Sequence, residues 1–516
     1  MNATWWRPVL TVALFSALPF AVFLNSNRAN LDPEAALGLY ALFLLVPGIA
    51  AVLVADRRGG PAARERAAVI FAALSFVLFQ FQIARSLAEV LGLESDAAAG
   101  LIWLALFAAA LVLAIRISRH PLSWNYAAVA GALLLALPVV QYATFRATSS
   151  AADLSAVAPR VGDLPPPERR PDVYFFLLDG YGRADQLERT IGFDNHAFLD
   201  ALTRRGFRVH DEATAAYPVT FLSLASTLSM GYPAEPGELD DHTPFFDAVG
   251  GQNEVVEAFS RLGYEFAFAS DYSSYECGDA VDICVQPEGD QLEGVGGERN
   301  VAILGATPLI TLLPALGVRL SPIRGYLSPE DVVRELARER SAQPLLSLAH
   351  LLTPHPPYRY LEGCALREDL TDPKIDYWGE ALGEGGEQYG QSIKCLNRSL
   401  LRTIDRIEAR ERNAIIVVQG DHGPKFGIEF HRPLSDWSQE QLDARFAILN
   451  AQRMPAACAT RGERAELAVN TFRLVLGCIV GRRLPLLSGR ELMIDLEAGE
   501  VEEIEVRTGH RRTANG

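Results

Sequence analysis

The sequence predicts a chain of two parts: an N-terminal region of five transmembrane helices, followed by an α/β three-layer domain with a mostly parallel sheet. Two observations predict this architecture. Five long uncharged runs lie within residues 1–146, and after residue 172 short apolar runs of strand length alternate with segments of helical pattern. The length of 516 residues is also too great for one ordinary hydrophobic core.

Each uncharged run reaches or approaches the length that a helix needs to cross roughly 30 Å of hydrocarbon. A cleaved signal peptide would explain the first run, but four more follow it. Buried core helices are the other interpretation, and five in succession with so few charges argue against it. The runs are residues 8–24, 35–55, 67–84, 97–115 and 121–145.

The loops between these runs carry arginines unequally, and this predicts the orientation. Arginines gather before the first run, between the second and third, and between the fourth and fifth, whereas the other two loops carry only Arg28 and Arg85. The positive-inside rule then places the N-terminus in the cytoplasm and everything after Phe145 outside. We therefore expect a multi-pass protein of the bacterial cytoplasmic (inner) membrane, with its α/β domain facing the periplasm or the exterior.

The polar two-thirds of the chain contains all six cysteines, none of them in a C-x-x-C or Cys/His zinc pattern. This distribution predicts three disulfides in an oxidising compartment, in agreement with the orientation. The simplest pairing joins nearest neighbours: Cys277–Cys284, Cys364–Cys395 and Cys458–Cys478.

A Ser/Ala/Pro-rich stretch at residues 147–171 lacks apolar periodicity and is predicted to be a linker. It divides the chain into a transmembrane domain (1–146) and a catalytic domain (172–516). The formal net charge of −16, without any block rich in Lys or Arg, argues against nucleic acid as a partner.

Within the α/β part, runs of consecutive apolar residues predict strands buried on both faces, as in a parallel sheet. Helices are predicted from apolar periodicity and start signals, such as Ser328-Pro329 followed by two acids. Strands are expected at 173–178, 207–210, 266–270, 345–352, 414–418 and 446–450, and helices at 195–205, 220–230, 253–262, 328–340, 389–410 and 463–480.

Polar residues follow three of these strands. Asp179 follows the first, His355 comes shortly after the fourth, and Asp421 and His422 follow the fifth. Ligands of open α/β sheets bind at the carboxyl ends of the strands, and a carboxylate beside an imidazole suits a divalent cation. Thr220 begins a predicted helix, where a phosphate or sulfate group is favoured; an N-cap role is the alternative.

Four segments occur in an order that resembles the alkaline phosphatase/sulfatase superfamily: DVYFFLLDGYGRAD, AYPVTFLSLASTLSM, TPHPPY and VVQGDHGP. The resemblance covers roughly residues 172–480. Five N-terminal membrane helices before such a domain are similar to lipoteichoic acid synthases and lipid A phosphoethanolamine transferases.

The resemblance implies a role for each matching residue. Asp179, Asp421 and His422 match the ligands of a divalent ion, and Thr220 matches the nucleophile, whose oxygen also faces the metal. His355 matches a histidine that contacts the transferred group. One Zn²⁺ or Mn²⁺ ion is the expected cofactor.

The chain also departs from the family pattern. Where sulfatases carry C/S-x-P-x-R, whose first residue becomes formylglycine, this chain has Thr220-Phe221-Leu222-Ser223. A second metal would need further ligands, and the nearby His350 and His431 are expected to be structural or to face substrate. Lys425 is a candidate contact for an anionic substrate, with a solvated lysine as the equal alternative; Arg183 has the same two interpretations.

The expected function is a membrane-bound phosphotransferase. It would move a phospho-headgroup, of phosphoglycerol or phosphoethanolamine type, from a membrane lipid to an envelope glycan or lipid acceptor. A membrane-tethered hydrolase of phosphate or sulfate esters and a catalytically inactive scaffold are the alternatives. The threonine at the nucleophile position favours phosphoryl over sulfuryl chemistry.

Overall fold

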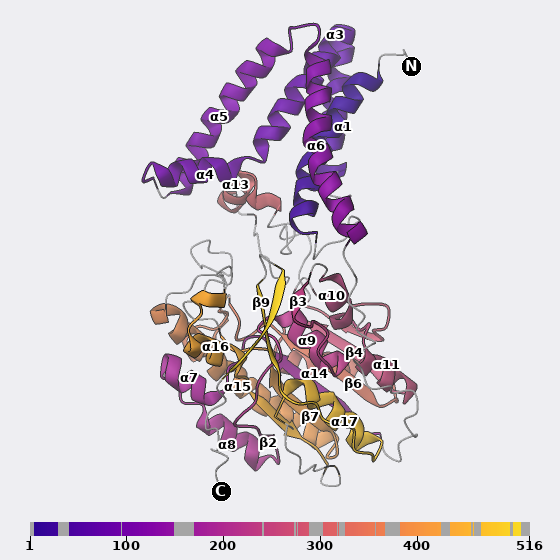
Figure 1. Cartoon of the computed structure of the whole chain (residues 1–516), viewed down its shortest axis with the longest axis vertical. Helices are drawn as coiled ribbons and strands as arrows, with labels where there is room; N and C mark the ends of the chain where they lie inside the picture. Colours follow the sequence, from indigo (N-terminus) through magenta and orange to yellow (C-terminus); the bar gives the residue numbers. More distant parts are fainter. Residues whose placement is uncertain are drawn as a thin grey trace. The chain divides into compact units, whose positions relative to one another are not determined.

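The structure is a computed structural model (Figure 1), and its regions are described separately. Its described residues exclude most of the predicted linker, Lys425 and His431. They are residues 5–28, 41–93, 95–148, 170–239, 242–272, 275, 277–287, 303–316, 318, 326–356, 358–366, 382–424, 434–455, 458, 466–495 and 499–506.

The chain divides into two compact units. The helical unit contains residues 1–150 together with residues 290–322, and the α/β unit contains residues 151–289 and 323–516. Residues 290–322 follow a strand of the α/β unit, and their place with the N-terminal helices was not predicted from the sequence.

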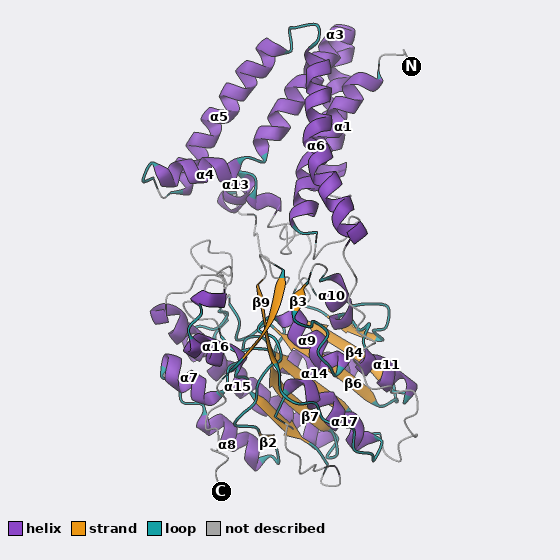
Figure 2. Cartoon of the chain, in the orientation of Figure 1, coloured by secondary structure: helices purple, strands orange, loops and turns teal. Residues whose placement is uncertain are grey.

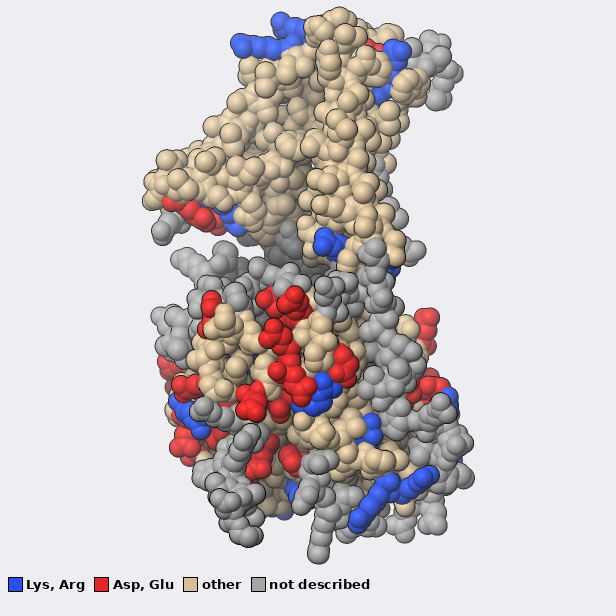
Figure 3. Space-filling model, viewed as in Figure 1, with Lys and Arg blue, Asp and Glu red and all other residues tan. Residues whose placement is uncertain are grey.

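Three helices of the helical unit are long and apolar enough to cross a membrane: α1 (Trp6–Ser26), α5 (Asp96–Ile117) and α6 (Ser123–Thr148). A fourth span results if α3 (Val46–Leu78) and α4 (Phe81–Val90), which meet at a bend of 50°, are counted as one. Figure 3 shows a surface almost without charged side chains along this unit, with Lys, Arg, Asp and Glu gathered towards its two ends.

The predicted number of five spans is not confirmed. The described part of the second uncharged run forms a short π-helical turn (Ala41–Leu45) and the start of α3, and most of the third run also lies within α3. This helix is interrupted at Gly60, whose φ of 67° lies outside the helical region, and Pro61 follows it. Three or four spans are therefore what the described residues support, and five stays a prediction.

The α/β unit contains a seven-stranded sheet in the order β2-β8-β7-β1-β6-β4-β5. The five strands from β7 to β5 run parallel, whereas β8 and β2 pair antiparallel at the other edge. The strands are β1 (Val173–Leu178), β2 (Arg208–Val209), β4 (Glu265–Ser270), β5 (Ile283–Val285), β6 (Leu345–Leu351), β7 (Ile415–Gly420) and β8 (Asn450–Arg453).

Alternate residues of β1 enter two separate hydrophobic cores, because successive side chains of a strand point to opposite faces. Tyr174 and Phe176 pack with α7, α8, α14 and α15, whereas Phe175 and Leu177 pack with α9, α11 and α17. The sheet thus lies between two helical layers, as predicted (Figure 2). The helices are α7 (Ala184–Ile191), α8 (His196–Arg204), α9 (Thr220–Ser229), α11 (Glu254–Arg261), α14 (Pro329–Glu339), α15 (Leu382–Arg410) and α17 (Thr471–Ile479).

Several elements differ from the prediction or were missed. The strand predicted at 446–450 begins only at Asn450, because Phe446 ends a helix, α16 (Gln439–Phe446), that caps itself through Ser438. A small antiparallel sheet of β3 (Gly237–Glu238), β10 (Glu500–Ile504) and β9 (Glu491–Asp495) was not predicted. Neither were α10 (Thr243–Val249) nor α13 (Leu309–Ala315).

The disulfide prediction is confirmed. Cys277 bonds to Cys284, Cys364 to Cys395, and Cys458 to Cys478. All three lie in the α/β unit, and the second fixes the short helix Glu362–Cys364 to the side of α15.

Candidate functional site

The carboxyl ends of the central strands carry the candidate site. In the parallel register Leu178 of β1 lies beside Gly420 of β7 and Leu351 of β6, so these three strands end at the same level. A Cβ atom at position 420 would lie 2.4 Å from the carbonyl oxygen of Tyr181, so only glycine allows the two chains to pass this closely. This close approach brings Asp179 and Asp421 together.

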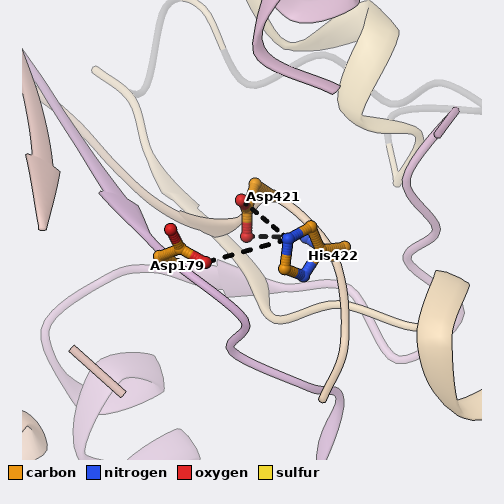
Figure 4. Close-up of side chains that lie close together, drawn as sticks. All are labelled: Asp179, Asp421 and His422. Carbon is orange, nitrogen blue, oxygen red and sulfur yellow. Dashed lines mark hydrogen bonds and ion pairs between the residues drawn. The ribbon is translucent and has the colours of Figure 1, made fainter. Parts of the chain in front are cut away.

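Asp179, Asp421 and His422 form one buried cluster (Figure 4). Each offers a ligand atom, and the three atoms lie within 4.8 Å of one another. The Nε2 atom of His422 is 3.3 Å from Asp421 Oδ2 and 3.8 Å from Asp179 Oδ1. The other ring nitrogen of His422 lies 3.1 Å from the carbonyl oxygen of Gly423, to which it can only donate a proton. In the neutral ring Nε2 therefore presents a lone pair towards the carboxylates.

The electrostatics of this cluster are set by two carboxylates buried close together. Burial, and then the charge of Asp179, raise the pKa of Asp421 to about 7, and burial also raises the pKa of Asp179. Burial lowers the pKa of His422 well below its usual value, which keeps the imidazole neutral.

The buried carboxylate oxygens of the cluster fit a metal ion. Among the described residues, no donor reaches Asp179 Oδ1 or Asp421 Oδ2, although both oxygens are buried. Buried carboxylate oxygens without donors are costly, and a cation between them removes that cost. Two carboxylates and a neutral imidazole are donors that Zn²⁺ and Mn²⁺ accept.

The hydroxyl of Thr220 lies at this cluster, 3.1 Å from His422 Nε2. Thr220 is the first residue of α9, and the N-cap position belongs to Val219, which has no side chain able to cap. The alternative interpretation of Thr220 as an N-cap is therefore wrong. One turn further along α9, Ser223 donates a hydrogen bond to the backbone oxygen of Asp421 at 2.6 Å, which fixes the helix start against the tip of β7.

Sequence reasoning missed Arg445, which lies buried at the end of α16. Its Nε donates to the carbonyl oxygen of Pro218 at 2.7 Å, and its Nη1 donates to that of Gly423 at 2.6 Å. One guanidinium thus joins the segment before Thr220 to the segment after His422. Burial lowers its pKa to about 10, so the group stays charged at neutral pH.

Two histidines of the β6 region border the cluster. His350 is fully buried, with Nε2 3.4 Å from Asp179 Oδ2 and Nδ1 3.2 Å from the hydroxyl of Ser270. Burial lowers its pKa. A Cβ atom placed on Gly180 would lie within 4.0 Å of both His355 and His422, so His355 is also a neighbour of the cluster.

Of the remaining candidates, Arg183 forms an ion pair with Asp185 at 2.7 Å and donates to the backbone of Ala213. Arg183 is buried, so the alternative of a solvated side chain is wrong, and its contact with an anionic substrate stays a prediction. Lys425 and His431 lie outside the described residues, so their predicted roles stay predictions.

A comparison with protein families decides the family. The sulfatase family profile matches residues 180–444, which is more than half of the chain. The chain belongs to the sulfatase family. The match begins directly after Asp179 and includes Thr220, His355, Asp421 and His422.

Solved structures of low sequence identity also align with the chain. The integral membrane lipooligosaccharide phosphoethanolamine transferase A of Neisseria meningitidis is 12% identical with a TM-score of 0.41, over 92% of this chain and 95% of that one. The C-terminal periplasmic domain of EcEptC from Escherichia coli is 12% identical with a TM-score of 0.39, over 66% and 96%. An alkaline phosphatase superfamily protein from Vibrio parahaemolyticus is 14% identical with a TM-score of 0.37, over 69% and 89%. No curated protein matches the chain by sequence.

Proposed function

We propose that this protein is a membrane-bound, metal-dependent phosphotransferase with Thr220 as its nucleophile. It transfers a phosphoglycerol- or phosphoethanolamine-type headgroup from a membrane lipid to an envelope glycan or lipid acceptor. The observation that carries the proposal is the 3.1 Å distance between the Thr220 hydroxyl and His422 Nε2, inside a buried cluster of two carboxylates. At this distance the hydroxyl lies close enough to the candidate metal ligands to bind the same ion.

Asp179, Asp421, His422 and the Thr220 oxygen would hold one divalent ion, Zn²⁺ or Mn²⁺. When bound, such an ion lowers the pKa of a neighbouring hydroxyl and draws charge from phosphoryl oxygens.

The residues of the chain position the phosphoryl group. The first backbone N–H groups of α9 have no partner within the helix, and Val219 supplies no capping side chain, so these groups are directed towards a phosphoryl oxygen at Thr220. Arg445 holds the Thr220 and His422 segments at a fixed separation. We assign His355 and Lys425 to contacts with the transferred group.

The transfer proceeds in two balanced steps. First the Thr220 oxygen forms a bond to phosphorus, the bond from phosphorus to the lipid alcohol breaks, and the alcohol leaves with the proton that Thr220 gives up. Then the acceptor hydroxyl forms a bond to the same phosphorus, the bond from the Thr220 oxygen to phosphorus breaks, and the acceptor's proton passes to that oxygen, which restores the threonine. Water in place of the acceptor gives the hydrolase that is the alternative function.

The proposed location is the cytoplasmic membrane, with the α/β unit outside. It is supported by the apolar helices, the loop arginines and three disulfides, which persist in oxidising compartments. A reporter enzyme fused after Arg146 should be active only if it functions outside the cytoplasm. Activity of a reporter that works only in the cytoplasm would overturn this orientation.

Mass spectrometry of the full-length protein from native membranes tests the mechanism. We expect a phospho-headgroup adduct on Thr220, whose mass identifies the headgroup, and its disappearance in Thr220→Val. Thr227→Val is the matched control, because Thr227 lies in the same helix and its hydroxyl bonds only to the backbone of Ser223 among the contacts described. An adduct that passes to water but to no envelope acceptor would favour the hydrolase. Absence of both adduct and turnover in the metal-loaded protein would leave the inactive scaffold.

A further inference from the structure

An uncharged segment in the polar part of the chain has a composition unlike its surroundings. Residues 301–318, VAILGATPLITLLPALGV, contain no charged side chain and lie between Arg299 and Arg319. They follow β5 and precede α14 in the sequence, yet they belong to the helical unit. At 18 residues, with glycine and two prolines among them, the segment is poorly suited to span a membrane alone.

The described residues of this segment pack on the helical unit at two places. Ile303 lies in one cluster with Phe20 of α1 and Leu44, which precedes α3. Ile310 of α13 packs against a second cluster that includes Phe81 of α4. The backbone N–H of Phe81 also donates to the carbonyl oxygen of Ala306 at 3.2 Å.

The opposite side of the segment is apolar and exposed. Leu312 is 50% exposed and Leu316 is 70% exposed. On α4, which turns away from α3 by 50°, Ile83, Leu87 and Val90 are exposed as well. Among the described residues of the α/β unit, by contrast, Leu361 and Leu366 are the two large apolar side chains that are exposed. Exposed leucines at 312 and 316 thus follow the pattern of membrane-facing helices.

We infer that residues 303–318 form a second membrane attachment, in which α13 and α4 lie together in the interfacial layer of the bilayer and Leu312 and Leu316 contact acyl chains. A short apolar segment beside a bent helix, with charges only at its flanks, has the composition of an interfacial element. The lipid occupant follows from continuity, because α4, with exposed Ile83, Leu87 and Val90, is the second half of the bent candidate span that begins with α3.

The contacts agree with the side of the membrane that the arginines predict. Phe20 lies near the end of the first uncharged run (8–24), and Phe81 lies near the end of the third (67–84). The ends of both runs are predicted to face outward. A segment inserted in the outer α/β unit can reach only those ends. The chain therefore connects the catalytic unit to the membrane both through the segment after α6 and through residues 290–322. This inference rests on the spanning helices and not on the catalytic proposal.

Spin-label accessibility in the full-length protein tests the attachment. The disulfides occupy all six cysteines, so an added thiol is labelled selectively. Leu312→Cys and Leu316→Cys are compared with Leu133→Cys, a 69% exposed position of α6, as the lipid control. Thr203→Cys, exposed on α8 of the α/β unit, is the aqueous control. The labelled proteins are reconstituted in vesicles of phosphatidylethanolamine and phosphatidylglycerol.

We expect labels at 312 and 316 to collide with oxygen several-fold more often than with a water-soluble nickel chelate, as at position 133. Nickel accessibility equal to that of position 203 would overturn the inference. Low accessibility to both reagents, together with coupling between spins of neighbouring molecules, would show that a second copy covers these leucines and would also overturn it. Loss of the catalytic adduct alone would leave this result unchanged.

Discussion

Replacing Asp421 by asparagine should stabilise the metal-free protein and remove most of the stabilisation that a bound metal ion gives. The substitution keeps the shape of the side chain and removes one of two buried charges. In the metal-free protein, burial and then the charge of Asp179 raise the pKa of Asp421 from 3.8 to about 7. The unfolded chain loses this proton near pH 4, whereas the folded chain keeps it until about pH 7. The metal-free protein therefore loses stability as the pH rises through this window.

The difference between 3.8 and about 7 corresponds to about 4 kcal/mol above pH 7. Asp421→Asn should recover about 2 to 4 kcal/mol of this free energy of unfolding at pH 8. At pH 5 it should recover only about 1 to 2 kcal/mol, because the folded carboxyl is still protonated while the unfolded one has already lost its proton. With metal this gain is largely offset. An ion at about 1,000 times its Kd adds about 4 kcal/mol to the wild-type protein. The variant, which lacks one anionic ligand, should bind the ion at least about 100-fold more weakly.

The assay is unfolding of the full-length protein in detergent, followed by near-ultraviolet circular dichroism at pH 5 and pH 8, with chelator or with Zn²⁺. Asp271→Asn is the matched control, because Asp271 is equally buried but forms an ion pair with Arg359 at 3.0 Å. Asp271→Asn leaves the buried guanidinium of Arg359 without its anionic partner and should destabilise both the metal-free and the metal-bound protein. If Asp421→Asn destabilises the metal-free protein at pH 8, the cluster is not an unbalanced pair of carboxylates and the metal hypothesis fails.

Two further predictions concern other buried groups. Arg445→Lys should lower kcat by about 10- to 100-fold without unfolding the protein, because an ammonium cannot bridge the carbonyl oxygens of Pro218 and Gly423. Arg473→Lys is the control and should leave kcat unchanged, because this buried arginine bonds to other backbone oxygens. Burial, and then Arg208, lower the pKa of His210 to about 4, so the unfolded chain binds this proton first as the pH falls from 6.5 to 4. The free energy of unfolding should drop by about 3 kcal/mol over that window, and His210→Gln should remove this drop. Denaturant titrations at several pH values measure it, and a pH dependence that is the same in the wild type and in His210→Gln would contradict the prediction.

The sequence predicts the parts of the fold whose pattern is set by burial on both faces. The first strand is predicted at 173–178 and observed as Val173–Leu178, because six apolar residues in a row suit a central strand whose faces both contact helices. Since parallel strands end at one edge, the residues after these strands were expected to meet. Asp179, Asp421 and His422 do meet.

The sequence fails where tertiary contacts decide the local structure. Arg445 and Phe446 lie at the start of the apolar run that predicted a strand at 446–450, yet they end a helix. Arg445 is buried there because its guanidinium donates to the backbone oxygens of Pro218 and Gly423. No local pattern marks such an arginine as internal. The segment 301–318 shows the same limit, since its partners are more than 200 residues away in the sequence. Its lack of charge was the available signal.

The charge of the site constrains which substrate it accepts. With both carboxylates ionised, the described groups Asp179, Asp421 and Arg445 carry one net negative charge. That charge would repel an anionic substrate unless the proposed divalent ion reversed it. A phosphodiester, with one negative charge, then brings the buried site to neutrality, whereas a doubly charged phosphate monoester leaves an excess charge that burial makes costly. Headgroup-bearing lipids are phosphodiesters. In competition experiments with the metal-loaded protein, a diester analogue should therefore inhibit at lower concentration than the monoester of the same alcohol, and the metal-free protein should bind neither. The reverse order would show that the buried charges do not select the substrate.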